Sequence, residues 1–341
     1  MPSPYARTLA MLAAEPRHWL LTGCAGFIGS HLLAKLLEAG QHVTGLDDFS
    51  TGKRANLEEI RAQVGQDAWN RFRLVEGDIR ERAICRDACR GAGFVLHHAA
   101  LVSVPLSIED PLRCNGINVD GFLNVLDAAR DVGVKRFVYA SSSAVYGDSP
   151  AMPACESAAC LPNSPYGTSK FINELYAAVF SRNYGISTTG LRYFNVFGTR
   201  QDPTGGYAAV IPKWIASALR REPCAIHGDG CNTRDFCHVD NVVQANILAA
   251  MSPVAGSEVF NVGLGEHTSL NELSALIGSQ VRKLDPSAEF PVPVHGPARS
   301  GDIMHSHADI SKIRRQLGFE PLGNLAGGVQ EMARWFADHA G

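Results

Sequence analysis

The sequence predicts an α/β protein with a doubly wound parallel sheet and a smaller mixed α/β lobe. Three observations predict this class. In the first two-thirds of the chain, short apolar runs alternate with amphipathic segments, which is typical of parallel strands with helices on both faces. A glycine-rich turn follows the first of these runs. Beyond about residue 192 the runs shorten and proline, glycine and polar residues become more frequent, so a separate lobe is expected there.

The elements of the main domain follow in order. A mildly apolar segment at 5–14 lacks the basic start and long apolar stretch of a signal peptide, so it is expected to be a short packed helix. Strands are predicted at the apolar runs Trp19–Thr22, Val43–Leu46, Phe72–Val75, Phe94–His97, Phe137–Ala140 and Thr188–Leu191. Helices are predicted at the amphipathic segments Phe27–Ala39, Arg82–Ala88, Val119–Val132 and Tyr166–Tyr184.

The smaller lobe is expected to be discontinuous in sequence. Val239–Met251 is predicted to be a helix, and Glu258–Val262 a short strand that returns to the main sheet. The main domain is therefore assigned to residues 1–191 together with 239–263. The lobe is assigned to residues 192–238 and 264–341.

Composition favours a small-molecule partner. Charged residues make up 19% of the 341 residues and the net charge is −3, with no basic run, which argues against a nucleic-acid surface. The nine cysteines contain no Cys-x-x-Cys pair and cannot all pair, so reduced thiols and a cytoplasmic location are expected. No metal site is expected at Cys85 and Cys89, because no nearby His or Cys completes one. No segment is long and apolar enough to enter a membrane.

A dinucleotide-binding loop is predicted at residues 22–29. Gly23, Gly26 and Gly29 allow a tight turn, close approach of the backbone to a pyrophosphate, and close packing of helix on strand. The following helix begins at Phe27 and Ile28, and its free N–H groups can bind the phosphates. This strand–turn–helix context indicates a Rossmann-type domain.

Further cofactor contacts are expected where the next strands end. Asp47 ends the second strand, where its carboxylate can accept bonds from the adenosine ribose and repel a 2′-phosphate, so NAD is favoured over NADP. Asp78 and Ile79 follow the third strand and are expected to contact the adenine. Ala99 follows the fourth strand and is expected to line the cofactor groove. For the last three residues, a purely structural turn is the alternative.

Tyr166 and Lys170 are spaced i, i+4 in a predicted helix, so the phenol and the ammonium can point into one site. A lysine charge beside a tyrosine favours the phenolate and is expected to bring the pKa of the phenol towards neutrality. This pair alone is weak evidence, because such pairs are common on solvated helix faces.

The glycine pattern, the run Ser141–Gly147 at the end of the fifth strand and the Tyr-x-x-x-Lys pair occur together in this order. In this the chain resembles the extended short-chain dehydrogenase/reductase family over nearly its whole length. The resemblance implies that Tyr166 is the acid/base and that Lys170 binds the nicotinamide ribose. It also implies that Ser142 bonds the reacting hydroxyl, with Ser143 a close second and Ser141 structural.

Departures from related subgroups narrow the chemistry. Nucleotide-sugar 4,6-dehydratases of this family carry an Asp-Glu pair just after the catalytic serine, and the decarboxylases carry a glutamate there. This chain has Ser143-Ala144 instead. The resemblance therefore favours reversible oxidation over dehydration or decarboxylation.

Later motifs resemble the family's UDP-sugar site. Asn195 matches the asparagine that contacts the diphosphate, and Ala209 and Val210 match the nucleotide-binding loop. Arg234 and Arg299 can bracket a pyrophosphate, since each guanidinium donates bidentately to phosphate oxygens. Asp302 is expected to bond the uridine ribose.

The segments 200–207, which contains Gln201, and 304–309 resemble those of bacterial UDP-N-acetylglucosamine 4-epimerases. In epimerases restricted to glucose and galactose, a bulky tyrosine stands where this chain has Ser306. The serine is therefore expected to leave room for a 2-acetamido group, with a plain surface serine as the alternative. Val102 departs from the lysine or glycine of relatives, whereas Ser103 remains available to bond the sugar.

Together these features predict C4 epimerisation of a UDP-N-acetylhexosamine through a 4-keto intermediate, with NAD retained. The alternatives are epimerisation of UDP-N-acetylglucosaminuronate or UDP-glucose, a keto-sugar-nucleotide reductase, and a non-catalytic dinucleotide sensor. The resemblance also implies a homodimer in which helices 119–132 and 166–184 form a four-helix bundle with their counterparts.

Overall fold

The structure is a computed structural model that describes residues 2–147, 152–204, 208–287, 290–298 and 304–339. Its centre is a seven-stranded sheet in the order β11-β6-β5-β4-β1-β2-β3, and every pairing within it is parallel. The order reverses between β1 and β4, the position at which doubly wound sheets bind ligands. The strands are β1 (His18–Thr22), β2 (His42–Asp47), β3 (Phe72–Glu76), β4 (Phe94–His97), β5 (Arg136–Ser142), β6 (Thr188–Tyr193) and β11 (Ser257–Val262).

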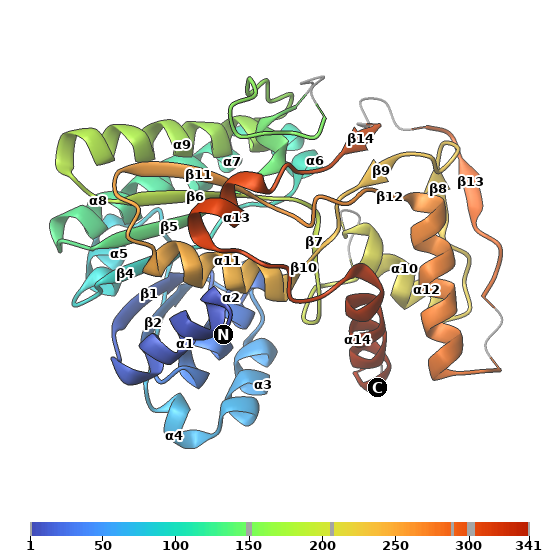
Figure 1. The fold of residues 1–341 in the computed structure, drawn as a ribbon, viewed down its shortest axis with the longest axis horizontal. Helices are drawn as coiled ribbons and strands as arrows, with labels where there is room; N and C mark the ends of the chain where they lie inside the picture. The colour runs from blue at the N-terminus through green and yellow to red at the C-terminus, as the bar shows by residue number, and fades with distance from the viewer. Residues whose placement is uncertain (1, 148–151, 205–207, 288–289, 299–303, 340–341) are drawn as a thin grey trace.

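Helices cover both faces of this sheet (Figure 1), and an apolar core lies against each face. One core includes Leu21 of β1, Leu36 of α2 and Val242 of α11, and the other includes Leu20 of β1 and Phe122 of α8. The helices of the first face are α1 (Pro4–Ala14), α2 (Phe27–Glu38), α3 (Arg54–Val64), α4 (Gln66–Trp69) and α11 (Val239–Met251). Those of the second are α5 (Arg82–Cys89), α8 (Phe122–Asp131) and α9 (Pro165–Tyr184). Consecutive residues of β1 thus serve opposite faces, as the alternation of a strand requires.

The predicted sheet, including the return of β11, is confirmed, and α1 packs against α11 as a short helix. The predicted helix 119–132 is confirmed as α8 over residues 122–131, whereas its first three residues belong to a preceding π-helical turn, η1 (Gly116–Gly121). Three short helices and a 3₁₀ turn were not predicted, because each has too few residues for a hydrophobic period. These are α4, α6 (Val104–Glu109), α7 (Pro111–Asn115) and η2 (Ser143–Val145). Helix α3 was missed as well, since only a narrow stripe of it is buried.

The second lobe lies beside the carboxyl ends of the strands and has its own core, which includes Trp214, Ile277 and Met332 (Figure 1). Its helices are α10 (Val210–Leu219), α12 (Leu270–Leu284) and α14 (Leu325–Asp338), whereas α13 (Ser311–Leu317) packs against β11. Its short strands pair as β7 (Val196–Phe197) with β10 (Cys237–His238), and β8 (Ala225–His227) with β13 (Val294–Gly296). A third small sheet has the order β12 (Thr268–Ser269), β9 (Thr233–Arg234), β14 (His305–Ser306). No helix in the described part of the chain could cross a membrane.

A buried ion pair fixes α9 to the sheet. Arg192 of β6 donates to both carboxylate oxygens of Glu174 on α9, at 2.9 and 2.7 Å, and both side chains are about 95% buried. The hydroxyl of Ser141, at the end of β5, donates to the same carboxylate at 2.6 Å. The guanidinium also lies 4.8 Å from the centre of the Tyr146 ring. One carboxylate therefore connects α9 to two strands.

Replacing Glu174 by Leu is expected to lower the free energy of unfolding by about 3–5 kcal/mol, because Arg192 then remains buried without its counter-ion. The double variant Glu174→Leu/Arg192→Met should recover much of this loss in urea denaturation. Asp87→Asn, which breaks the exposed Arg73–Asp87 pair, is the matched control and should change stability by less than about 1 kcal/mol. A loss as small as that of the control in Glu174→Leu would contradict the role of the pair.

Candidate active site

The glycine loop has the geometry of a phosphate cradle. Gly23 has φ +70°, and a Cβ there would lie 2.8 Å from the backbone nitrogen of Ala99. A Cβ on Gly29 would lie 1.9 Å from the Gly23 carbonyl oxygen, so both positions admit only glycine. Gly26 is the N-cap of α2 and offers no side-chain cap. The first N–H groups of the helix thus face the loop without a side-chain acceptor, which suits a dinucleotide pyrophosphate.

Asp47 has a second role that the sequence did not indicate. Its two carboxylate oxygens accept bonds from the backbone nitrogens of Ala25, at 2.8 Å, and Phe49, at 2.9 Å. It therefore holds the glycine loop against the end of β2. Burial raises the pKa of this carboxyl, which the two backbone bonds partly offset. Each carboxylate oxygen keeps a lone pair for the predicted ribose contact.

The other predicted cofactor residues lie where neighbouring strands end. Asp78 accepts a bond from Arg80 Nε at 2.9 Å, and the guanidinium lowers the pKa of this carboxyl. Ile79 is buried against Gly121 of η1. The backbone nitrogen of Ala99 donates to Thr22 Oγ1 at 3.1 Å, which places Ala99 directly beside the glycine loop.

Ser142, Tyr166 and Lys170 meet at the carboxyl end of β5. Ser164 caps α9 by accepting a bond from Gly167 N at 3.1 Å, so Tyr166 lies in the first turn. The Ser142 hydroxyl lies near the Tyr166 phenol and acts to lower the pKa of that group. Lys170 Nζ lies 5.9 Å from the centre of the Tyr166 ring and donates to the Ala140 carbonyl at 3.0 Å.

Within the described chain, Ser143 forms no side-chain hydrogen bond, so the geometry favours Ser142 of the two candidate serines. Ser141 is engaged by Glu174, as its structural assignment requires.

The expected lowering of the Tyr166 pKa by Lys170 is not found. Burial raises the pKa of Tyr166 to about 12, and the nearby Ser142 hydroxyl only partly opposes this. Lys170 is 1% exposed, and burial lowers its pKa to about 8. The desolvation of both groups therefore outweighs their mutual interaction.

Several supporting residues were missed by sequence reasoning. Asn118, in the π-helical turn, donates to Ser169 Oγ at 3.0 Å and to the Leu101 carbonyl at 3.0 Å, and so supports the residue beside Lys170. Tyr166 N donates to Ser107 Oγ at 3.1 Å. The only sequence signal that could have identified them was the presence of polar residues within otherwise apolar segments.

Three predicted substrate residues lie together in the second lobe. Asn195 Nδ2 donates to the Asp235 carbonyl at 3.2 Å, and Asp235 N donates to the Ser306 carbonyl at 2.9 Å. Ser306 pairs in register with Arg234 across β14 and β9. A guanidinium, an amide and a small side chain thus share one edge of the lobe.

The remaining predicted substrate residues do not contact this group of three directly in the described hydrogen bonds. Ala209 is the N-cap of α10 and Val210 its first residue. Gln201 Nε2 donates to the Val196 carbonyl at 3.3 Å. Ser103 caps α6, accepting from Leu106 N at 3.2 Å, so its hydroxyl can donate but is already used as an acceptor. Arg299 and Asp302 lie outside the described residues.

Comparison with known proteins identifies the family of this chain. Residues 19–263 match the NAD dependent epimerase/dehydratase family. The UDP-glucose 4-epimerase of Mycolicibacterium smegmatis is 36% identical over 319 residues, which are 93% of this chain and 97% of that protein.

Two solved structures are similar throughout. The UDP-N-acetylglucosamine 4-epimerase from Methanobrevibacter ruminantium M1, in complex with UDP-N-acetylmuramic acid, has a TM-score of 0.87 and 36% identity, covering 95% of this chain and 99% of that one. The UDP-glucose 4-epimerase of Thermus thermophilus, in complex with NAD, has a TM-score of 0.82 and 32% identity, covering 94% and 99%. The predicted cofactor is thus confirmed at the level of the family. The chain belongs to the NAD dependent epimerase/dehydratase family, among the UDP-sugar 4-epimerases.

Proposed function

We propose that this protein interconverts UDP-N-acetylglucosamine and UDP-N-acetylgalactosamine by inverting C4. The observation that carries the proposal is the contact of Ser142 with Tyr166, one helical turn from the buried Lys170. Support for the acetylated sugar comes from Ser306, a small residue in register with Arg234. A similar structure is that of a UDP-N-acetylglucosamine 4-epimerase, although the curated relative acts on UDP-glucose.

In this mechanism Tyr166 removes the proton of the C4 hydroxyl and later returns a proton to the C4 oxygen. Ser142 orients the hydroxyl, and Lys170 stabilises the phenolate. Bound NAD supplies the hydride acceptor and donor, together with a positive charge near the phenol. Asn195 and Arg234, with Arg299 as the sequence predicts, hold the UDP while the 4-keto sugar turns its other face.

Because the pKa of Tyr166 is about 12, catalysis requires that this pKa be lowered when cofactor and substrate bind. With this value the phenol is protonated at neutral pH, so it must lose its proton before it can remove that of the C4 hydroxyl. The charge on Lys170 is then the protein's own means of favouring the phenolate. Because the pKa of Lys170 is about 8, this charge is present at pH 7 and is lost on the alkaline side.

Other substrates and another reaction are the second candidates. UDP-glucose and UDP-N-acetylglucosaminuronate differ from the proposed substrate at C2 or C6, and no described side chain distinguishes the C6 group. A net reductase with the same residues would release its cofactor after each turnover, whereas an epimerase retains it.

We also propose a cytoplasmic homodimer. Large apolar side chains are exposed on one stretch of α9, where Leu175 is 53% exposed and Tyr176 and Val179 are each 38% exposed. Helix α9 packs beside α8 at one edge of the molecule (Figure 1). Pairing of these two helices with their counterparts would cover an apolar surface that is otherwise in water.

The proposal predicts C4 inversion without added cofactor. The purified protein is incubated separately with UDP-N-acetylglucosamine, UDP-N-acetylglucosaminuronate and UDP-glucose, and the products are read by NMR. The acetylated hexosamine should be converted fastest. Tyr166→Phe should lower turnover by roughly 100-fold or more while UDP-sugar binding persists. Tyr184→Phe, an exposed tyrosine on the same helix, is the control. No inversion of any sugar, or normal turnover in Tyr166→Phe, would reject the proposal.

Lys170→Met is expected to abolish turnover yet stabilise the fold. The folded pKa of Lys170, about 8, lies below the ordinary value of 10.5, so the unfolded state binds more protons between these values. Burying the charged lysine therefore costs up to about 3 kcal/mol below pH 8, and this cost declines as the pH rises. Urea denaturation should show the variant more stable at pH 7, with the difference shrinking towards pH 10. A pH-independent difference, or a less stable variant at pH 7, would contradict this account.

Ser306→Tyr should select against the acetylated sugar. A bulky ring at this position is expected to lower kcat/KM for UDP-N-acetylglucosamine by roughly tenfold or more while UDP-glucose is affected much less. Ser306→Ala, which stays small, should leave both values near those of the unmodified protein. Equal losses for the two substrates in Ser306→Tyr would remove Ser306 from the selection of the sugar.

A further inference from the structure

A histidine outside the active site is held rigidly between the two lobes. His238 ends β10 and is the N-cap of α11, and its side chain is 6% exposed. Its ring packs edge-on against Phe197, with 5.4 Å between ring centres. Helix α14 approaches both rings so closely that a Cβ on Gly328 would lie 2.6 Å from His238 Cδ2 and 2.8 Å from the Phe197 ring. The position of the ring is thus fixed by its packing.

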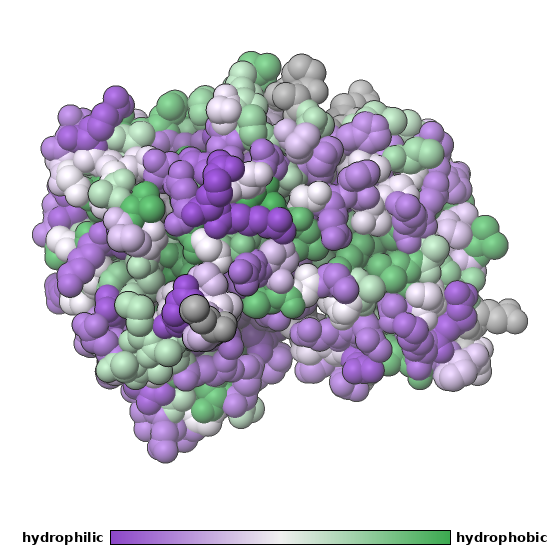
Figure 2. Space-filling model, viewed as in Figure 1, coloured by the Kyte–Doolittle hydropathy of each residue, from purple (hydrophilic) through white to green (hydrophobic). Residues whose placement is uncertain are grey.

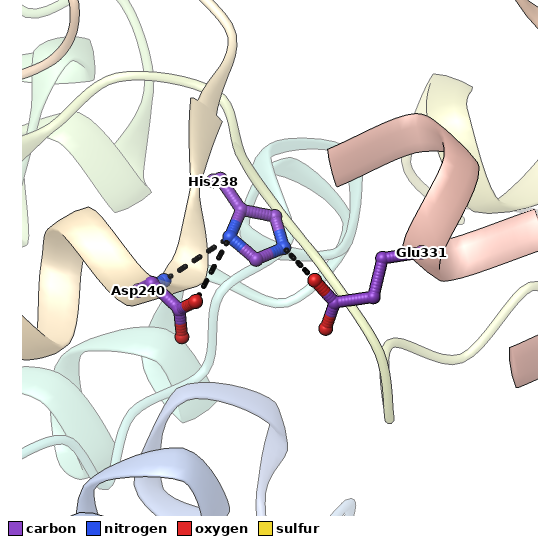
Figure 3. Close-up of side chains that lie close together, drawn as sticks. All are labelled: His238, Asp240 and Glu331. Atoms are coloured by element: carbon purple, nitrogen blue, oxygen red, sulfur yellow. Dashed lines mark hydrogen bonds and ion pairs between the residues drawn. The ribbon is translucent and has the colours of Figure 1, made fainter. Parts of the chain in front are cut away.

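Two carboxylates face the two ring nitrogens (Figure 3). Nδ1 lies 3.6 Å from Asp240 Oδ2, in the first turn of α11, and Nε2 lies 3.8 Å from Glu331 Oε2 of α14. One donor atom from each of the three residues lies within 4.8 Å of the others. Nε2 is buried and has no hydrogen-bond partner within the described residues. Buried polar atoms in proteins nearly always have a partner, so a buried ring nitrogen that faces a carboxylate without bonding it suggests that a ligand atom lies between them.

The surroundings do not supply the missing cation. Among the described residues, His238 is the only charged or chargeable partner within 4.0 Å of either Asp240 or Glu331. Three cationic side chains line the same groove. Lys35 and Arg200 are paired with Glu38 and Glu59, and Arg334 of α14 has no carboxylate within 4.0 Å among the described residues, Glu331 included. Both carboxylates are more than half exposed. They line a groove of about 640 Å³ between α2, α3 and α14, visible as a hollow between the lower parts of the molecule in Figure 2. Solvent and ions can therefore reach them.

We propose that His238 and Glu331 bind one divalent transition-metal ion of the zinc type. Imidazole nitrogen with carboxylate oxygen suits Zn²⁺ or Co²⁺, whereas Mg²⁺ and Ca²⁺ prefer oxygen ligands alone. Zinc binds each such ligand at about 2.1 Å, so two ligands can be up to about 4.2 Å apart. The 3.8 Å between Nε2 and Glu331 Oε2 satisfies this limit without movement of the main chain.

Asp240 supports the site as a hydrogen-bond partner of the histidine, not as a metal ligand. As the cap of α11, Nδ1 accepts a long bond of 3.5 Å from the backbone nitrogen of Asp240. A metal on Nε2 requires the ring proton on Nδ1, so this bond would be replaced by one that Nδ1 donates to the Asp240 carboxylate, 3.6 Å away. This carboxylate–histidine–metal order fixes the tautomer and makes the nitrogen a better ligand. Asp240 also offsets the positive end of α11, which would otherwise disfavour a cation. The bound ion would join α14 of the second lobe to the start of α11, which packs on the main sheet.

The test uses untagged, EDTA-treated full-length protein, with Zn²⁺ binding measured by calorimetry and Co²⁺ binding by visible absorption. One ion per chain is expected, together with a higher Tm that EDTA reverses. Glu331→Gln and His238→Asn should abolish saturable binding, and Asp240→Asn should weaken it roughly 10- to 100-fold. Asparagine can still cap α11, so His238→Asn is expected to fold.

Two control variants separate this site from adventitious binding. Glu38→Gln removes another carboxylate from the same groove, and Cys231→Ser removes the exposed thiol. Both should bind Co²⁺ as the unmodified protein does. The proposal is overturned if the unmodified protein shows no saturable binding, or if Glu331→Gln binds with unchanged affinity. Since none of these residues belongs to the candidate active site, either result leaves the proposed epimerase function untouched.

Discussion

The buried carboxylate of Glu174 is the constraint on which the site geometry depends. It accepts bonds from Arg192 of β6 and from Ser141 of β5, while its own helix carries Tyr166 and Lys170. Ser141 directly precedes Ser142, so the same carboxylate fixes both the strand end that holds the serine and the helix that holds the phenol. A contact between side chains from two separate elements needs such a common anchor, because neither element alone determines their separation.

Burial of Lys170 and Tyr166 shifts the pKa of each group, and burial of the lysine charge also lowers the stability of the fold. Lys170 has one hydrogen bond to a carbonyl and almost no contact with water, so its charge is held in an unfavourable medium. The same medium strengthens its influence on any negative charge that develops nearby. The raised pKa of Tyr166 has the same origin. At neutral pH the protein therefore holds Tyr166 as the neutral phenol and Lys170 as the ammonium, and the phenol must lose its proton before it can act as a base.

The sequence predicts the main sheet and the catalytic pair because both have short-range signatures. Apolar runs identify the strands, and the glycine spacing with Asp47 identifies the phosphate loop. The bond from Asn118 to Ser169, the bond from Tyr166 N to Ser107 and the bracing of the loop by Asp47 depend on contacts between distant segments. The lowered pKa of Lys170 could not be anticipated either, since spacing alone does not show burial. His238 and Glu331 are 93 positions apart, and no local pattern connects them.

The path of the chain between the two lobes has a mechanical consequence. After β6 the chain enters the second lobe, returns at α11 and β11, leaves again, returns at α13 and ends in α14. Several covalent crossings therefore connect the two bodies, so they cannot swing about one hinge as two domains with a single linker can. Access for a large nucleotide sugar must come from loop rearrangement or slight shear, and excision of either lobe would cut the chain at several points instead of at one linker.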